Sequence, residues 1–144
     1  SMKKLLILVC ATTLLLAGGK TYGQGNDGSS NKPTDQKVSV KNIDANEAEK
    51  LLQENKKVLV LDVRTPKEFS AGHIAGATNL NFNDADFEKR LAALDKTKPY
   101  LVHCAVGGRS AKAREVMKTQ QFMIIYHLEG GLKAWEKAGN PVEH

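Results

Sequence analysis

The residue best suited to covalent chemistry is Cys104, which stands in the segment HCAVGGRS at residues 103–110. A thiolate is a strong nucleophile, whereas a lone cysteine often serves only as a small buried apolar side chain. The other cysteine, Cys10, falls in an apolar run near the N-terminus. Cys104 is therefore either a buried, unreactive residue of the core or a reactive nucleophile. The residues around it in sequence decide between the two interpretations.

Two glycines and an arginine follow Cys104. Gly107 and Gly108 allow the backbone to curl tightly, and a helix that begins soon afterwards aims its positive end at the same point. Such a turn binds anions and lowers the pKa of a thiol at its base. Arg109 adds a planar cation suited to a sulfur oxyanion or a persulfide. Because a cation is misplaced at a helix N-terminus, we expect Arg109 to face an anion and Cys104 to be reactive.

A parallel sheet with crossover helices must position this turn. Continuous apolar runs predict strands at residues 58–63, 100–103 and 123–128, with shorter strands at 38–40 and 78–80. Capping boxes that begin at Asp44 and Thr65, with Glu47 and Glu68 as their acids, predict helices at residues 44–55 and from 65 onward. Further helices are predicted at 84–94, 110–119 and 132–138. The order predicts an α/β fold with an open, mainly parallel sheet of about five strands and helices on both faces. Cys104 then lies at the carboxyl end of a strand, where such sheets bind ligands.

The N-terminal 37 residues are predicted to lie outside this domain. Two lysines precede an apolar run at residues 5–17, which is typical of a secretory signal ending near residue 23, and Ser1 is interpreted as a cloning remnant. The run is short for a membrane span, which needs roughly 20 residues. Residues 24–37 contain no large apolar side chain and predict a flexible linker, so the domain is expected at 38–144.

We therefore expect an exported protein, periplasmic or secreted, with no stable membrane span in its mature form. A lipoprotein is not expected, because Cys10 lies inside the apolar run rather than at its end. Removal of Lys3, Lys4 and Lys20 with the signal reduces the net charge from +5 to +2. The remaining charge is small and scattered, so no nucleic-acid partner is expected.

The pattern of Cys104, Gly107, Arg109 and Ser110 resembles the active-site loop of the rhodanese family. Three other stretches resemble flanking motifs of that family and occur in the same order along the chain. They are DVR with EF at residues 62–64 and 68–69, GHIAGA at 72–77, and EGGLKAW at 129–135. The resemblance covers roughly residues 38–142 and implies a rhodanese-like fold.

The resemblance also implies a rhodanese-type (thiosulfate) sulfurtransferase. In such an enzyme Cys104 takes sulfane sulfur from thiosulfate, polysulfide or a persulfide donor and passes it to a thiophilic acceptor such as cyanide or a thiol. By the same resemblance Arg109 helps to bind the donor anion, and no metal or organic cofactor is implied. The implied substrate-binding loop comprises Ala105, Val106, Gly107, Gly108 and Ser110.

Other polar residues are expected to have supporting roles. Asp62 and Arg64 lie at a predicted strand end and are expected to pair and brace the loop. His103 is not expected to act as a general base, because adjacent side chains of a strand point to opposite faces. His73 is interpreted as a turn or packing residue, and His127 as a residue within a strand.

Two alternative functions remain open. Ala105 and Val106 are apolar where family members often carry Arg or Lys, so thiosulfate is expected to be a poor donor. A thiol persulfide, polysulfide, or a protein sulfur donor or acceptor becomes correspondingly more plausible. The first alternative is a sulfide- or polysulfide-binding module, or a sulfur carrier without turnover. The second is a rhodanese-related phosphatase or arsenate reductase, which has a longer loop than the four residues between Cys104 and Arg109.

Overall fold

The structure is a computed structural model that describes residues 37–144. The predicted signal segment and all of the predicted linker except Lys37 lie outside the described residues. Strands and helices alternate along the described part of the chain. In order, they are β1 (Ser39–Ile43), α1 (Ala45–Glu54), β2 (Leu59–Asp62), α2 (Pro66–Ala71), β3 (Thr78–Asn79), α3 (Phe87–Ala92), β4 (Pro99–His103), α4 (Gly108–Thr119), β5 (Ile124–Leu128) and α5 (Gly131–Lys137).

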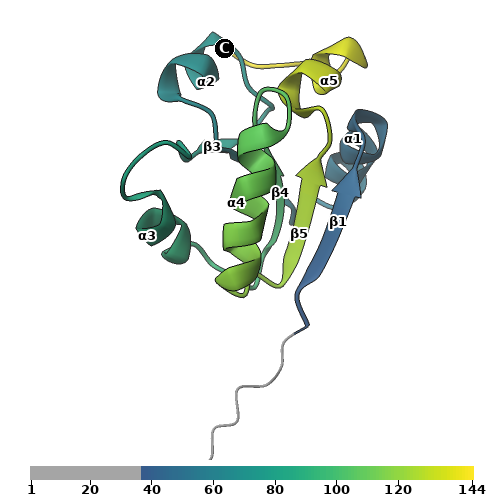
Figure 1. The fold of residues 1–144 in the computed structure, drawn as a ribbon. Helices are drawn as coiled ribbons and strands as arrows, with labels where there is room; N and C mark the ends of the chain where they lie inside the picture. The colour runs from purple at the N-terminus through teal and green to yellow at the C-terminus, as the bar shows by residue number, and fades with distance from the viewer. Residues whose placement is uncertain (1–36) are drawn as a thin grey trace, which may run out of the picture. The chain divides into compact units, whose positions relative to one another are not determined.

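The five strands form one parallel sheet in the order β1-β5-β4-β2-β3 (Figure 1). Each face of the sheet is covered by its own apolar cluster. One cluster gathers side chains of α3 and α4, and the other gathers side chains of α1 and α5. In β4, Leu101 belongs to one cluster and Val102 to the other, which explains why this strand is continuously apolar. The predicted α/β architecture is confirmed.

Local sequence signals fix the starts of two helices. Asp44 and Thr65 each accept a hydrogen bond from the backbone three residues on, and both complete a capping box with a glutamate. The predicted helix at residues 84–94 is too long, because the Asp84 carboxylate is occupied by Asn81 and Arg90 and the helix starts only at Phe87. The helix expected from residue 110 starts two residues earlier, after a glycine that carries no capping side chain.

The carboxyl ends of the strands meet at one edge of the sheet. The starts of α4 and α5 and the short helix α2 gather there (Figure 1). Segments far apart in sequence, residues 62–72, 103–110 and 128–133, are thereby brought to the same edge. Within residues 37–144, no helix is long and apolar enough to cross a membrane.

Candidate active site

Cys104 lies directly after β4, at the base of the turn that leads into α4. Its side chain is only 1% exposed. The Gly107 N–H donates a hydrogen bond to Cys104 Sγ at 3.1 Å, and the Ser110 hydroxyl lies 3.4 Å from the same sulfur. Gly107 adopts a φ of +109°, a conformation that favours glycine, and this lets the backbone curl around the sulfur.

These surroundings change the pKa of the Cys104 thiol. Burial raises the pKa of Cys104, because it removes water from the charged form. The hydrogen bonds from the Ser110 side chain and from the backbone N–H groups of Ser110, Gly107 and Val106 outweigh burial, so the net pKa of Cys104 lies below its ordinary value. The turn therefore favours a thiolate without any basic side chain in contact with the sulfur among the described residues.

The N-terminus of α5 supports the same turn through two backbone hydrogen bonds. The Leu132 N–H donates to Cys104 O at 2.8 Å, and the Lys133 N–H donates to Ala105 O at 3.0 Å. Gly131 has a φ of +61°, and a Cβ at this position would stand 2.5 Å from Cys104 O and 2.6 Å from the Ala105 carbonyl carbon. Only glycine permits this close approach, which explains why the EGGLKAW stretch belongs with the cysteine loop.

Arg109 does face an anion, and that anion is the carboxylate of Glu68 in α2. The two side chains form a bidentate pair with both nitrogen–oxygen distances at 2.8 Å. The hydrogen bond from Arg109 is the main reason why the pKa of Glu68 falls to about 2, with Thr65 also contributing. The same pair raises the pKa of Arg109. Sequence reasoning missed this pairing, because it placed Glu68 only at a predicted helix start and in a flanking stretch of the family resemblance.

Asp62 and Arg64 form a buried ion pair, with Arg64 Nη2 2.6 Å from Asp62 Oδ2. Arg64 Nη2 also donates to Gly72 O at 2.7 Å. These contacts tie the end of β2 to the end of α2. Among the described residues, neither side chain hydrogen-bonds to the loop at 104–110. Asp62 Oδ2 lies 3.6 Å from Nε2 of His103, the residue before the cysteine. Contacts between the pair and the loop are therefore indirect and pass through neighbouring residues.

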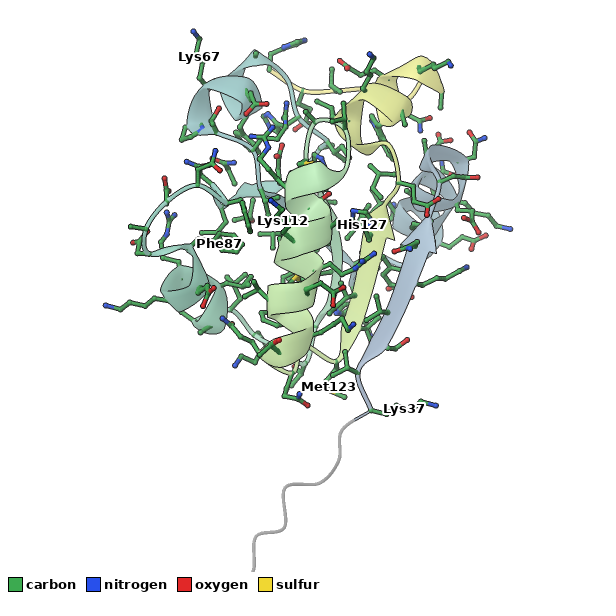
Figure 2. All side chains as sticks on the ribbon, viewed as in Figure 1. Lys37, Lys67, Phe87, Lys112, Met123 and His127 are labelled. Carbon is green, nitrogen blue, oxygen red and sulfur yellow. The ribbon has the colours of Figure 1, made fainter. Side chains whose placement is uncertain are left out.

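The two buried histidines near the loop have different positions. His103 Nδ1 lies 3.1 Å from Cys104 O and does not reach the sulfur. His127 is 6% exposed, and its Nε2 lies 2.9 Å from Ser110 Oγ, the hydroxyl that contacts Cys104. Figure 2 shows His127 on β5, beside α4. Sequence reasoning missed this contact; the alternation of Ile125 and His127 toward the α4 face was the available signal.

The other residues of the implied substrate-binding loop follow Cys104 in the turn. Ala105 is partly buried, whereas Val106 is 64% exposed at the rim. Gly108 is the first residue of α4. Within the described part of the chain, no group of three or more His, Cys, Asp or Glu side chains could hold a metal ion.

Comparisons with known proteins agree with this architecture. A family model described as the rhodanese-like domain matches residues 44–138. A thiosulfate sulfurtransferase, GlpE of Pseudomonas putida, is 38% identical over 93 residues, which cover 64% of this chain and 81% of the relative. An uncharacterized protein of Bacillus subtilis, YqhL, is 35% identical over 80 residues, which cover 56% of this chain and 62% of the relative.

A similar solved structure is a rhodanese-related protein from Thermoplasma volcanium. It is 33% identical, with a TM-score of 0.64, and the match covers 72% of this chain and 97% of the other. The domain match spans β2 to β5 and includes the cysteine loop. The chain belongs to the rhodanese-like domain family.

Proposed function

We propose that this protein is a sulfurtransferase that carries sulfane sulfur as a persulfide on Cys104. The observation that carries the proposal is the position of Cys104 Sγ, at the focus of backbone N–H donors and the Ser110 hydroxyl. Such donors stabilise a negative charge on sulfur in both the thiolate and the persulfide. The similarity to named thiosulfate sulfurtransferases supports the same chemistry.

The proposed reaction has two displacement steps. The Cys104 thiolate attacks the outer sulfur of a donor; with thiosulfate, the sulfur–sulfur bond breaks and sulfite leaves with the bonding electron pair. An acceptor nucleophile then attacks the outer sulfur of the persulfide. With cyanide, this step forms thiocyanate and returns Cys104 as a thiolate, so the protein undergoes no net oxidation.

The loop favours a donor other than a free anion. Arg109 is already neutralised by Glu68, and the carboxylate repels a second anion nearby. Val106 presents an apolar side chain, 64% exposed, at the rim of the turn. Both features support a thiol persulfide or a partner protein as the sulfur donor, with the free anions thiosulfate and polysulfide as the poorer ones. The Glu68 carboxylate also disfavours a phosphate substrate.

A sulfur carrier without efficient turnover is the second candidate. The exposed Val106 rim supports it, because a carrier delivers sulfur to a docked protein rather than to small acceptors. Carrier and enzyme share the persulfide and differ only in its release.

The experiment that tests the proposal compares the wild type with Cys104→Ser and with Cys10→Ser as the matched cysteine control. Each protein is incubated with thiosulfate and cyanide, and in parallel with polysulfide and cyanide; thiocyanate and intact mass are measured. Turnover in the wild type and Cys10→Ser, but not in Cys104→Ser, supports a sulfurtransferase. A stable gain of about 32 Da without turnover indicates a carrier. No adduct from either donor contradicts the proposal.

Export of the protein is a separate proposal, supported by the charged and then apolar order of residues 2–17. The test is the N-terminal sequence of the protein recovered from its source cells. A start near Gln24 supports export, whereas a retained segment 2–17 contradicts it.

A further inference from the structure

The Ser110 hydroxyl stands at the centre of a small buried network. Its oxygen lies 3.4 Å from Cys104 Sγ, 3.2 Å from Gly107 O and 2.9 Å from His127 Nε2. A hydroxyl has one hydrogen to donate, so these three atoms compete for it. Ser110 stabilises the sulfur only when that hydrogen points at Cys104.

The ring of His127 decides this competition. Within residues 37–144, His127 Nδ1 is buried without a hydrogen-bond partner. An unpaired buried N–H is rarer in folded proteins than an acceptor that lacks a donor, so the neutral ring keeps its proton on Nε2. Nε2 then donates to Ser110 Oγ and no longer competes for the hydroxyl hydrogen.

The remaining two acceptors are unequal. Gly107 O is a neutral carbonyl, whereas Cys104 Sγ carries a full negative charge when the thiol is ionised. Hydrogen bonds to charged acceptors are about twice as strong as those between neutral groups. The hydroxyl hydrogen of Ser110 therefore points at the sulfur in the thiolate state.

We infer that His127 is a positioning residue, which acts through Ser110 to hold Cys104 as a thiolate. The chain of donors runs from His127 Nε2–H to Ser110 Oγ and from the Ser110 hydroxyl to Cys104 Sγ. This role rests on the proposed sulfur transfer for its purpose, but its effect on the thiol exists without any sulfur donor.

The surroundings keep the His127 ring neutral. Burial and the Arg114 guanidinium of α4 lower the pKa of His127, and the Gly107 carbonyl and Glu129, one residue beyond β5, oppose that shift. The neighbouring strands contribute no charge at this level, since His127 pairs with Asn42 of β1 and Val102 of β4. A neutral ring at neutral pH donates from one nitrogen, as the inference requires.

The test is the pKa of Cys104, measured on the full chain from the pH dependence of its alkylation by iodoacetamide. The peptide containing Cys104 is followed by mass spectrometry, which separates it from Cys10. His127→Leu removes the donor, and we expect the pKa of Cys104 to rise by about one unit, with roughly tenfold slower alkylation below that pKa. His127→Gln places an amide N–H near the position of Nε2 and is expected to restore most of the shift.

A double-mutant comparison separates this role from packing. In a Ser110→Ala background, His127→Leu is expected to leave the pKa of Cys104 unchanged, because the link to the sulfur is already absent. Tyr126→Phe, one residue away on the opposite face of β5, is the matched control and should leave the pKa at the wild-type value.

Two results overturn the inference: no pKa change in His127→Leu, or an equal change in the Ser110→Ala background. Failure of the proposed sulfur transfer is a different result, since it leaves the alkylation measurement intact. A pKa shift without thiocyanate production therefore supports the role of His127 while contradicting turnover.

Discussion

Two neighbouring turns at the carboxyl edge of the sheet share one backbone design and serve different ends. Each follows a strand, β4 or β5, and each helix behind it starts after a left-handed glycine, Gly107 or Gly130, that supplies no capping side chain. Three residues separate β4 from Gly107, whereas only Glu129 separates β5 from Gly130. The extra length lets the first turn curl around Cys104.

The two turns differ in the acceptors to which their backbone N–H groups donate. In the β4–α4 turn, N–H groups point at the sulfur of Cys104. In the β5–α5 turn, the N–H groups of Leu132 and Lys133 point at the carbonyls of Cys104 and Ala105. The second turn therefore supports the first. The N-terminus of a helix serves as an anion site only where the fold places a negatively charged group beside it.

Removing the close approach between the turns gives the largest expected effect. Gly131→Ala adds a Cβ that meets Cys104 O and the Ala105 carbonyl, and it strains a positive φ. We expect a loss of roughly 2–5 kcal/mol in the free energy of unfolding, together with most of the persulfide formation. Urea unfolding and mass spectrometry measure the two effects.

Gly76→Ala is the matched control for this prediction, because Gly76 also has a positive φ but a Cβ there meets nothing within 4 Å. It should lose only about 1–2 kcal/mol and keep persulfide formation. Equal losses in the two variants would show that the contact between the turns adds nothing.

The Glu68–Arg109 pair distinguishes the first turn from the second, which has Leu132 at the position equivalent to Arg109. Arg109→Gln is expected to raise the KM for thiosulfate about tenfold, the loss of one charge-assisted hydrogen bond. Glu68→Gln should lower that KM, because the guanidinium loses its competing partner. Arg90→Gln, in an exposed pair with Asp84, is the control. A rise in KM for Glu68→Gln would mean that the pair orients Arg109 rather than occupying it.

A charge at the rim of the first turn gives a smaller effect. Val106→Lys is expected to raise kcat/KM about threefold for thiosulfate and for polysulfide, because both are dianions that the added cation attracts. Leu59→Lys, at an exposed apolar position at the start of β2, is the matched control. An equal gain in both variants would assign the effect to net charge rather than to the loop.

The smallest expected effect is on stability in acid. The pKa of Glu68 falls from 4.5 to about 2 in the folded protein. A lowered carboxylate pKa contributes stability above pH 4.5 that is lost as the pH falls toward 2. The pair is partly exposed, so its contribution is at most about 1 kcal/mol. Unfolding between these pH values should show a weaker pH dependence in Glu68→Gln; an unchanged slope would contradict the folded-state pair.

The sequence predicted those parts of the molecule that depend on local patterns. The buried strands followed from continuous apolar runs, two helix starts followed from capping boxes at Asp44 and Thr65, and the Cys104 turn followed from its glycines. The predicted α/β fold and its parallel sheet are confirmed. The start of α4, which has no capping side chain, was harder to place.

The partners of the site residues depend on register and on side-chain directions across the sheet edge. Arg109 and its partner Glu68 are 41 positions apart, and Ser110 and His127 are 17 apart. Gly131 meets the carbonyl of Cys104 only because β5 lies beside β4 in parallel. A single sequence names the residues of such contacts but does not pair them.

The most direct test of the central claim is the origin of the sulfur found on Cys104. The full chain is incubated with thiosulfate labelled with heavy sulfur at the outer position only, and in parallel with the inner-labelled form. The Cys104 peptide should gain one heavy atom, about 34 Da, from the first and one light atom, about 32 Da, from the second, with sulfite as the product of both. A label that enters from the inner sulfur, or no sulfur on Cys104 from thiosulfate and from polysulfide alike, would contradict the persulfide account.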